Sequence, residues 1–483
     1  MRGLTLAALV LAFSVSVPVA AAEKPATLQR RIDAILDRPA LAPAFWGVEV
    51  RSTRSGRILY ARNAEKNFKP ASTLKVVTTA AALDAFGPDA RFRTTVETAG
   101  RLDDKGMIVG DIYLVGGGDP NLSGRFTQGR ATVPFEQLAS QMAAAGVRRV
   151  EGRVIGHEGL FAGDRRGEDW SRGDLVWCYG AEVSALSLND NCVDVTAAPA
   201  EREGDPVVVA ASPRSSYYRI VSSATTSARG TPAELRVERD PGGNLIRLSG
   251  TQPVGQKPWQ GSIALEDPAR YAATVFREVL AASGIVVTGD VDTLSAPLPA
   301  ARRTLATLES APVSELIGTI NKTSQNLHTE MMLRLLGARR GGVGTQESGR
   351  EAVEEFLLRM GVRPETWQLQ DASGLSRSDL VSPHEMVSLL AAMDRHPHAA
   401  VFRASLPIAG VDGTLDSRMK GTAAEGRVQA KTGTIRNVNA LAGYATTRSG
   451  ERLAFYAVVN HHTAEGSDAV AALDALAALL AGS

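Results

Sequence analysis

The two ends of this chain and its middle carry different hydrophobic patterns, and this difference limits the folds open to it. Apolar residues recur at helical spacing near the ends, for example over 316–336, and three strands and a helix close the sequence. From about Ala197 to Trp259 the chain instead shows short strands between Pro and Gly turns. The pattern predicts one domain of helices and sheet, interrupted by one or two inserted domains.

The segment 70–77, with sequence PASTLKVV, is predicted to begin a buried helix. Ser72 and Lys75 are three residues apart, so they share one helix face. A serine hydroxyl is a weak nucleophile. A lysine amine can take its proton only where burial or nearby positive charge keeps the amine neutral. The pair is therefore a candidate nucleophile and base.

Two further motifs follow in the chain, Ser324-Gln325-Asn326 and then Lys431-Thr432-Gly433-Thr434. A Ser-x-x-Lys pair alone is weak evidence, because a second copy occurs at 417–420 and a second Ser-x-Asn occurs at 187–189. Ser324 and Asn326 are also suited to capping a helix, and 431–433 to an exposed strand edge. The joint order of the three motifs favours an active site over these structural alternatives.

Composition is that of an ordinary globular protein. The chain has 483 residues, 44% hydrophobic and 22% charged, and its 53 basic and 52 acidic residues leave a net charge of +1. This balance gives no support to binding of nucleic acid or of an anionic membrane surface. The length suffices for two or three domains.

The first 22 residues have the pattern of an export signal. Arg2 precedes an apolar stretch over 4–19, and Ala20-Ala21-Ala22 offers a cleavage site for a signal peptidase. The alternative is an anchor that is retained, but the apolar stretch is marginal for spanning a bilayer. The sequence therefore predicts an exported protein without an integral membrane anchor, periplasmic where the source has two membranes.

Two cysteines are present, Cys178 and Cys192. An oxidising compartment permits a disulfide between them, and closing a loop of about 15 residues is worth ~3 kcal/mol in the chain-entropy model. The alternative is a pair of free buried thiols. Neither cysteine has the spacing of a metal site, and the seven histidines do not cluster as ligands.

The motif order resembles that of the low-molecular-mass class C penicillin-binding proteins, the D-alanyl-D-alanine carboxypeptidase/endopeptidase family. The resemblance extends over nearly the whole chain after the leader and includes specific flanking sequences: 114–120 (LVGGGDP), 179–181 (YGA), 184–186 (SAL), 371–377 (DASGLSR) and 413–415 (GTL).

This resemblance implies an α/β (α+β) penicillin-recognising domain, as in serine β-lactamases, with an antiparallel sheet flanked by helices. It predicts a discontinuous catalytic domain over 23–97 and 300–483. A second domain is expected over 98–196 and 259–299, and a small third domain, nested in it, over 197–258. Both inserted domains are expected to be mostly β-structure.

Chemistry and resemblance together suggest roles for the first two motifs. Ser72 attacks the carbonyl carbon of a D-Ala peptide bond, and Lys75 acts as its base. Ser324 relays a proton to the leaving amine, and Asn326 holds the substrate amide. The backbone N–H groups of Ser72 and Thr434 resemble the oxyanion hole of the family.

The third motif is expected to bind the substrate carboxylate. Lys431 supplies positive potential, which attracts the carboxylate and lowers the pKa of Lys75. Thr432 and Thr434, on either side of Gly433, offer hydroxyls to the same carboxylate. The implied substrates are peptidoglycan stem peptides and cross-links, and β-lactams would acylate Ser72. The resemblance implies no metal and no cofactor.

One segment departs from the family pattern. Where the family is expected to carry an acid that meets the free amine of diaminopimelate, ahead of Phe161, this chain has His157 followed by Glu158. Arg377 is retained and is expected to meet the side-chain carboxylate. The sequence therefore predicts either an altered side-chain preference or Glu158 acting in place of the missing acid.

The sequence leaves two rival functions open. A β-lactamase would share the three motifs, but it needs a dedicated deacylating base that no motif here supplies. A cell-wall binding protein that is acylated without turning over substrate would need a blocked cleft. The sequence favours a serine DD-peptidase over both.

Overall fold

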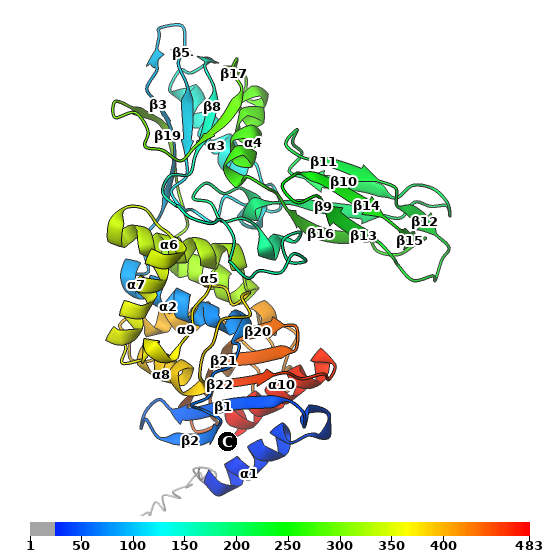
Figure 1. The fold of residues 1–483 in the computed structure, drawn as a ribbon, viewed down its shortest axis with the longest axis vertical. Coiled ribbons are helices and arrows are strands. Elements are labelled where there is room, and N and C mark those ends of the chain that lie inside the picture. Colours follow the sequence, from blue (N-terminus) through cyan, green and yellow to red (C-terminus); the bar gives the residue numbers. More distant parts are fainter. Residues whose placement is uncertain (1–24) are drawn as a thin grey trace, which may run out of the picture.

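The computed structural model describes residues 25–483, and Figure 1 shows them as three bodies. The lower body contains both ends of the described chain, whereas the upper body and the body at its side come from the middle. The predicted signal peptide lies outside the described residues. Within the described part, no helix is long and apolar enough to cross a membrane.

The lower body is built on an antiparallel sheet with strand order β2-β1-β22-β21-β20. Its register is fixed by pairs such as Val48 with Ala457. Because β20 lies at one edge, it has a neighbour on one side only. The strands are β1 (Phe45–Ser52), β2 (Ile58–Arg62), β20 (Val428–Ile435), β21 (Val438–Thr446) and β22 (Arg452–Asn460).

Alternate residues of this sheet pack against two different helix layers, because successive side chains of a strand point to opposite faces. Phe455 lies in the core shared with α1 (Pro25–Leu36) and α10 (Gly466–Gly482). Tyr456 lies in the core shared with α2 (Lys75–Phe86) and α8 (Pro383–Met393). The expected antiparallel sheet between helices is confirmed, as is the packing of the last helix on it (Figure 1).

The remaining helices of the lower body lie between the sheet and the upper body (Figure 1). The apolar pattern predicts a single helix over 316–336, and this prediction is wrong. The chain leaves helical geometry at Ser324, which has a left-handed φ of 60°, so two helices form there. The helices are α5 (Val313–Thr323), α6 (Asn326–Gly341), α7 (Gln346–Arg359) and α9 (Ala399–Ser405).

The upper body has two sheets, with strand orders β18-β8-β6-β3-β19 and β17-β7-β5-β4, and two helices whose Phe135 and Phe276 pack edge to face. Its elements are β3 (Arg93–Thr98), β4 (Arg101–Leu102), β5 (Met107–Val109), β6 (Ile112–Val115), α3 (Val133–Ala144), β7 (Arg149–Glu151), β8 (Val154–His157), α4 (Pro268–Ala282), β17 (Val286–Val287), β18 (Val291–Leu294) and β19 (Arg303–Glu309).

The side body consists of short strands in sheets of order β10-β9-β16, β11-β14-β13 and β12-β15. They are β9 (Cys192–Ala198), β10 (Val208–Ser212), β11 (Arg219–Ser222), β12 (Thr225–Ser227), β13 (Arg236–Arg239), β14 (Leu245–Ser249), β15 (Thr251–Pro253) and β16 (Trp259–Ala264). Short 3-10 helices occur along the chain: η1 (Pro39–Leu41), η2 (Ala71–Leu74), η3 (Gly124–Phe126), η4 (Cys178–Gly180), η5 (Asn189–Asn191), η6 (Pro364–Thr366) and η7 (Gly413–Leu415).

Candidate active site

The first motif lies where η2 passes into α2. The Lys75 amine is 2.8 Å from the hydroxyl of Ser72 and donates to the carbonyl of Ser373 at 2.6 Å. The Lys75 side chain is fully buried. The geometry that the spacing predicts is therefore present, since the amine reaches the hydroxyl across one helical turn.

Burial lowers the pKa of Lys75 to about 7, although the carboxylates of Asp371, Glu330 and Asp379 oppose this shift. Burial disfavours the charged form of an amine, so a large fraction of Lys75 is neutral near pH 7. The sequence predicted a lowered pKa, caused either by burial or by a nearby positive charge, for which Lys431 was the expected source. In the structure the main cause is the exclusion of water from the Lys75 side chain.

A carboxylate that the sequence did not reveal supports the carbonyl facing Lys75. Glu330, on α6, accepts hydrogen bonds through one oxygen from the N–H groups of Ala372 and Ser373, at 3.0 and 2.9 Å. Burial raises the pKa of Glu330 to about 7. Because Glu330 and this loop are about 40 residues apart in the chain, no local pattern indicated their contact.

The second motif forms the junction between α5 and α6. Gln325 caps α6, since its side-chain oxygen accepts from the N–H of Leu327 at 3.0 Å. The capping role considered for Ser324 and Asn326 therefore belongs to the residue between them. The hydroxyl of Ser324 is free to lie 2.9 Å from the Lys431 amine.

The third motif occupies the edge strand β20, beside η2. A Cβ atom on Gly433 would lie 2.7 Å from the carbonyl oxygen of Pro70, so glycine permits the close approach of the strand to η2. Lys431 is fully buried, and burial together with the charge of Lys75 lowers its pKa well below the ordinary value. Thr432 donates to Thr414 at 2.8 Å.

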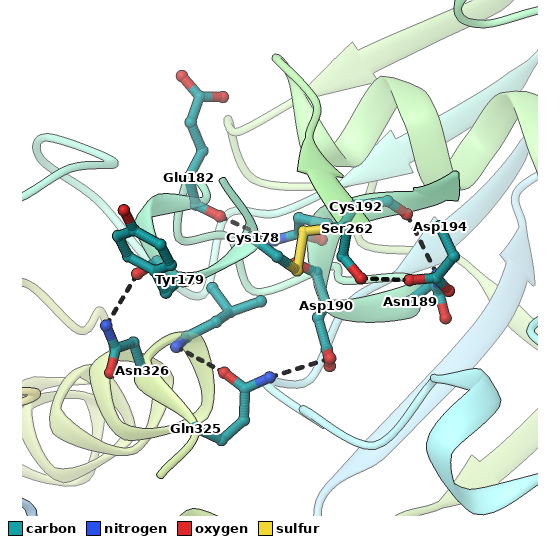
Figure 2. The surroundings of a disulfide bond; sticks show 12 residues. Cys178, Tyr179, Glu182, Asn189, Asp190, Cys192, Asp194, Ser262, Gln325 and Asn326 are labelled. Carbon is teal, nitrogen blue, oxygen red and sulfur yellow. Dashed lines mark hydrogen bonds between the residues drawn. A yellow bond between two sulfur atoms is a disulfide. The ribbon is translucent and has the colours of Figure 1, made fainter. Parts of the chain in front are cut away.

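A cavity of about 300 Å³ opens beside the second motif. It is lined by Ser324 and Asn326 from the lower body and by Trp177 and Tyr179 from the segment that leads to the side body. The Asn326 amide donates to the carbonyl of Tyr179 at 2.9 Å (Figure 2). The segment before β9 thus forms one wall of the candidate site.

Glu158 and Arg377 lie apart from the motif side chains. Glu158 is buried and accepts hydrogen bonds from Arg165 and, at 2.7 Å, from Ser184. It lines a separate cavity of about 390 Å³, and none of the described residues lining that cavity belongs to a motif. Arg377 is exposed at the end of the loop whose Ser373 carbonyl faces Lys75.

Asp174, an acid that the sequence analysis did not single out, is linked to the second motif through Tyr179. It accepts a hydrogen bond from the Tyr179 hydroxyl at 3.2 Å, and the carbonyl of the same tyrosine contacts Asn326. Asp174 has no motif of its own, so only the fold could reveal its position.

Within residues 25–483, no group of three or more His, Cys, Asp or Glu side chains is placed to hold a metal ion.

Comparison with known proteins gives consistent matches. The family model described as "D-Ala-D-Ala carboxypeptidase 3 (S13) family" matches residues 28–480. A D-alanyl-D-alanine carboxypeptidase of Actinomadura sp. (strain R39) is 37% identical over 466 residues, which cover 94% of this chain and 84% of the relative. DacB of Haemophilus influenzae, also named a D-alanyl-D-alanine carboxypeptidase, is 26% identical, with 86% and 85% covered.

Solved structures show the same fold. Penicillin binding protein 4 (dacB) from Haemophilus influenzae superposes with a TM-score of 0.81 at 24% identity, covering 92% of this chain and 97% of that one. A predatory peptidoglycan endopeptidase, Bd3459 from Bdellovibrio bacteriovorus, superposes with a TM-score of 0.51 at 16% identity, with 90% and 91% covered.

Proposed function

Because this chain belongs to the D-Ala-D-Ala carboxypeptidase 3 (S13) family, we propose that it is a serine-type DD-peptidase in which Ser72 is the nucleophile. The observation that carries the proposal is the contact of 2.8 Å between the Ser72 hydroxyl and the buried amine of Lys75. A buried, largely neutral amine at hydrogen-bond distance can accept the hydroxyl proton as attack begins.

The acylation step uses the first two motifs. Ser72 Oγ bonds to the carbonyl carbon of the penultimate D-Ala while Lys75 takes its proton. The negative charge on the carbonyl oxygen is stabilised by the backbone N–H groups of Ser72 and Thr434. The C–N bond then breaks, and the proton held by Lys75 passes through Ser324 to the departing D-Ala amine, which leaves an acyl-enzyme and a neutral Lys75.

Substrate orientation rests on Asn326 and the third motif. Asn326 holds the amide of the stem peptide. Lys431 and the hydroxyls of Thr432 and Thr434 bind the terminal carboxylate of D-Ala, and Gly433 lets β20 lie close to η2. Water then attacks the acyl carbonyl carbon while Lys75 takes one of its protons. The ester bond to Ser72 Oγ breaks, Lys75 returns the proton to Oγ, and the shortened peptide leaves as an acid.

We extend the proposal to D-Ala–diaminopimelate cross-links and to covalent binding of β-lactams at Ser72. The cross-link and the β-lactam each offer a carbonyl carbon in the position of the one in the D-Ala-D-Ala peptide bond. The structural relative from Haemophilus influenzae has also been solved in complex with a novel β-lactam. Peptidoglycan lies outside the inner membrane, and the Cys178–Cys192 disulfide suits an oxidising compartment, so we place the protein in the periplasm.

The direct test is release of D-Ala from a D-Ala-D-Ala stem peptide by the protein without residues 1–22. We expect release of one D-Ala per peptide, blocked by prior incubation with penicillin. Rapid release of hydrolysed penicillin would instead favour a β-lactamase. Stable acylation by penicillin without any release of D-Ala from the peptide would favour a cell-wall binding protein.

We also propose that an acid outside the motifs meets the free amine of the stem-peptide side chain, with Arg377 on its carboxylate. Glu158 and Asp174 are the two candidates. Asp174 is favoured because it is bonded to Tyr179, which contacts Asn326, whereas Glu158 is engaged by Arg165 and Ser184.

Asp174→Asn is therefore expected to lower the preference for a free side-chain amine over its acetylated form, by about tenfold for loss of one charge-assisted contact. The measurement is kcat/KM on both peptides for the wild type, Asp174→Asn and Glu158→Gln. A preference lost only in Glu158→Gln would reverse the assignment.

A further inference from the structure

A disulfide-closed loop contacts the second motif from outside the catalytic body. Cys178 and Cys192 are bonded, with an S–S distance of 2.09 Å, which confirms the predicted pairing. The loop 178–192 that they close begins in η4 and ends at the first residue of β9. Figure 2 shows the disulfide beside Tyr179 and Asp190, two residues of the loop that form hydrogen bonds with the start of α6 and its cap.

Asp190 is the main side chain in this contact. It is 3% exposed, and its carboxylate accepts from the Gln325 amide and lies by His328 Nε2, both at 2.9 Å. Arg125 forms an ion pair with the same carboxylate. Burial by itself would raise the pKa of Asp190, but His328 and Arg125 hold it below the ordinary value, so the group stays charged.

The backbone around Asp190 is strained, which indicates that its position is imposed by its surroundings. Asn189, Asp190 and Asn191 all have left-handed φ angles, of 48°, 57° and 58°. Non-glycine residues rarely adopt this region, and three in succession persist only where neighbouring structure holds them. The disulfide closes the loop two residues after Asp190, and Asn191 donates to the carbonyl of Glu182 at 2.8 Å.

The contacts of this loop cover the first turn of α6. The Tyr179 carbonyl accepts from Asn326, while Asp190 holds Gln325 and His328. Gln325 is also the residue that caps α6, so its amide joins the loop to the helix end. The side chain proposed to hold the substrate amide is therefore oriented by residues of another body.

We propose that the loop 178–192 positions the second motif, with Asp190 as a positioning residue and the Cys178–Cys192 disulfide as its brace, so that Asn326 is oriented toward the amide of the acyl donor. This inference rests on the proposed function, because it assigns a source for the orientation of Asn326. It also assigns a role in amide recognition to a segment that lies outside the three motifs.

A contact with the substrate amide allows the positioning role of the loop to be distinguished from a general effect on folding. Benzylpenicillin carries an acylamino side chain, whereas 6-aminopenicillanic acid has a free amine in its place. A displaced Asn326 loses a contact with the first compound only. The quantity to measure is the ratio of their second-order rate constants for acylation of Ser72.

The test compares four variants with the wild type. Asn326→Ala is the reference for complete loss of the amide contact. Asp190→Ala keeps the disulfide and removes the carboxylate, and a double variant, Cys178→Ser with Cys192→Ser, removes the brace.

Asp194→Asn is the matched control in the same region. Its carboxylate contacts Ser262 and Asn189 but no residue of α6. An asparagine can keep both contacts, because the Ser262 hydroxyl can accept as well as donate.

We expect Asn326→Ala to lower the ratio about tenfold, the loss of roughly one hydrogen bond. Asp190→Ala and the double variant are expected to lower it at least about threefold, and Asp194→Asn to keep the wild-type ratio. If the double variant fails to fold, Asp190→Ala decides alone.

Three results would count against the inference. An unchanged ratio in Asp190→Ala, including the case in which both rate constants fall equally, would overturn the positioning role while leaving the proposed function intact. An unchanged ratio in Asn326→Ala would overturn both that role and the proposed amide contact. A wild type that neither compound acylates would overturn the proposed function itself, and the inference with it.

Discussion

Ser72→Ala is expected to gain no mass on incubation with benzylpenicillin, whereas the wild type gains one equivalent of the antibiotic. The alanine removes the atom that forms the covalent bond, so no acyl-enzyme can form. Loss of a catalytic serine costs on the order of a millionfold in turnover in a serine protease, so D-Ala release is expected to fall to background as well. Intact-mass measurement shows the adduct directly, and peptide turnover gives the second readout.

The chain contains a matched control for this experiment. Ser417 and Lys420 repeat the Ser-x-x-Lys spacing, but both residues are exposed. Ser417→Ala is therefore expected to keep the adduct and the activity. An adduct on Ser72→Ala would mean that another residue is the nucleophile. No adduct on the wild type would mean that the motifs were misread or that the cleft is closed.

Contacts within one or two turns of the chain could be predicted from the sequence. The Ser72–Lys75 pair depends only on helical spacing, and the three closing strands and last helix follow from short apolar patterns. The disulfide needed only two cysteines and an oxidising compartment. The common feature is that each prediction rests on local geometry or on a limited choice of partners.

Features that depend on distant contacts were missed. The break between α5 and α6 lies at a left-handed Ser324, whose hydroxyl is contacted by Lys431 from the distant strand β20. Glu330 and Asp190 are single acids without a motif, and each acquires its role from a partner in another part of the chain. The sequence likewise left the cause of the Lys75 pKa shift open between burial and the charge of Lys431, since the burial of a side chain is a property of the whole fold.

Wild-type acylation is expected to rise with pH and to reach half its maximum near pH 7. The base must be neutral to accept the Ser72 proton, and the pKa of Lys75 is lowered to about 7, so acid inactivates the enzyme by protonating the amine. Lys75→Arg cannot lose its charge near neutral pH, and it is expected to lose about 10²- to 10⁴-fold in rate at pH 8. The measurement is the rate constant for acylation by penicillin between pH 5 and 9.

Lys431 is a second lysine with a lowered pKa, so the pH profile alone does not show which lysine is the base. A variant of Glu330 distinguishes the two. The charge of Glu330 raises the pKa of Lys75, although burial raises the pKa of Glu330 itself to about 7, so this charge is present mainly above pH 7. The pKa of Lys431 is lowered by burial and by Lys75. Glu330→Gln keeps the oxygen that accepts from Ala372 and Ser373 but removes the charge. Its midpoint is therefore expected to lie below that of the wild type. A midpoint that moves upward would mean that the titrating base is not Lys75.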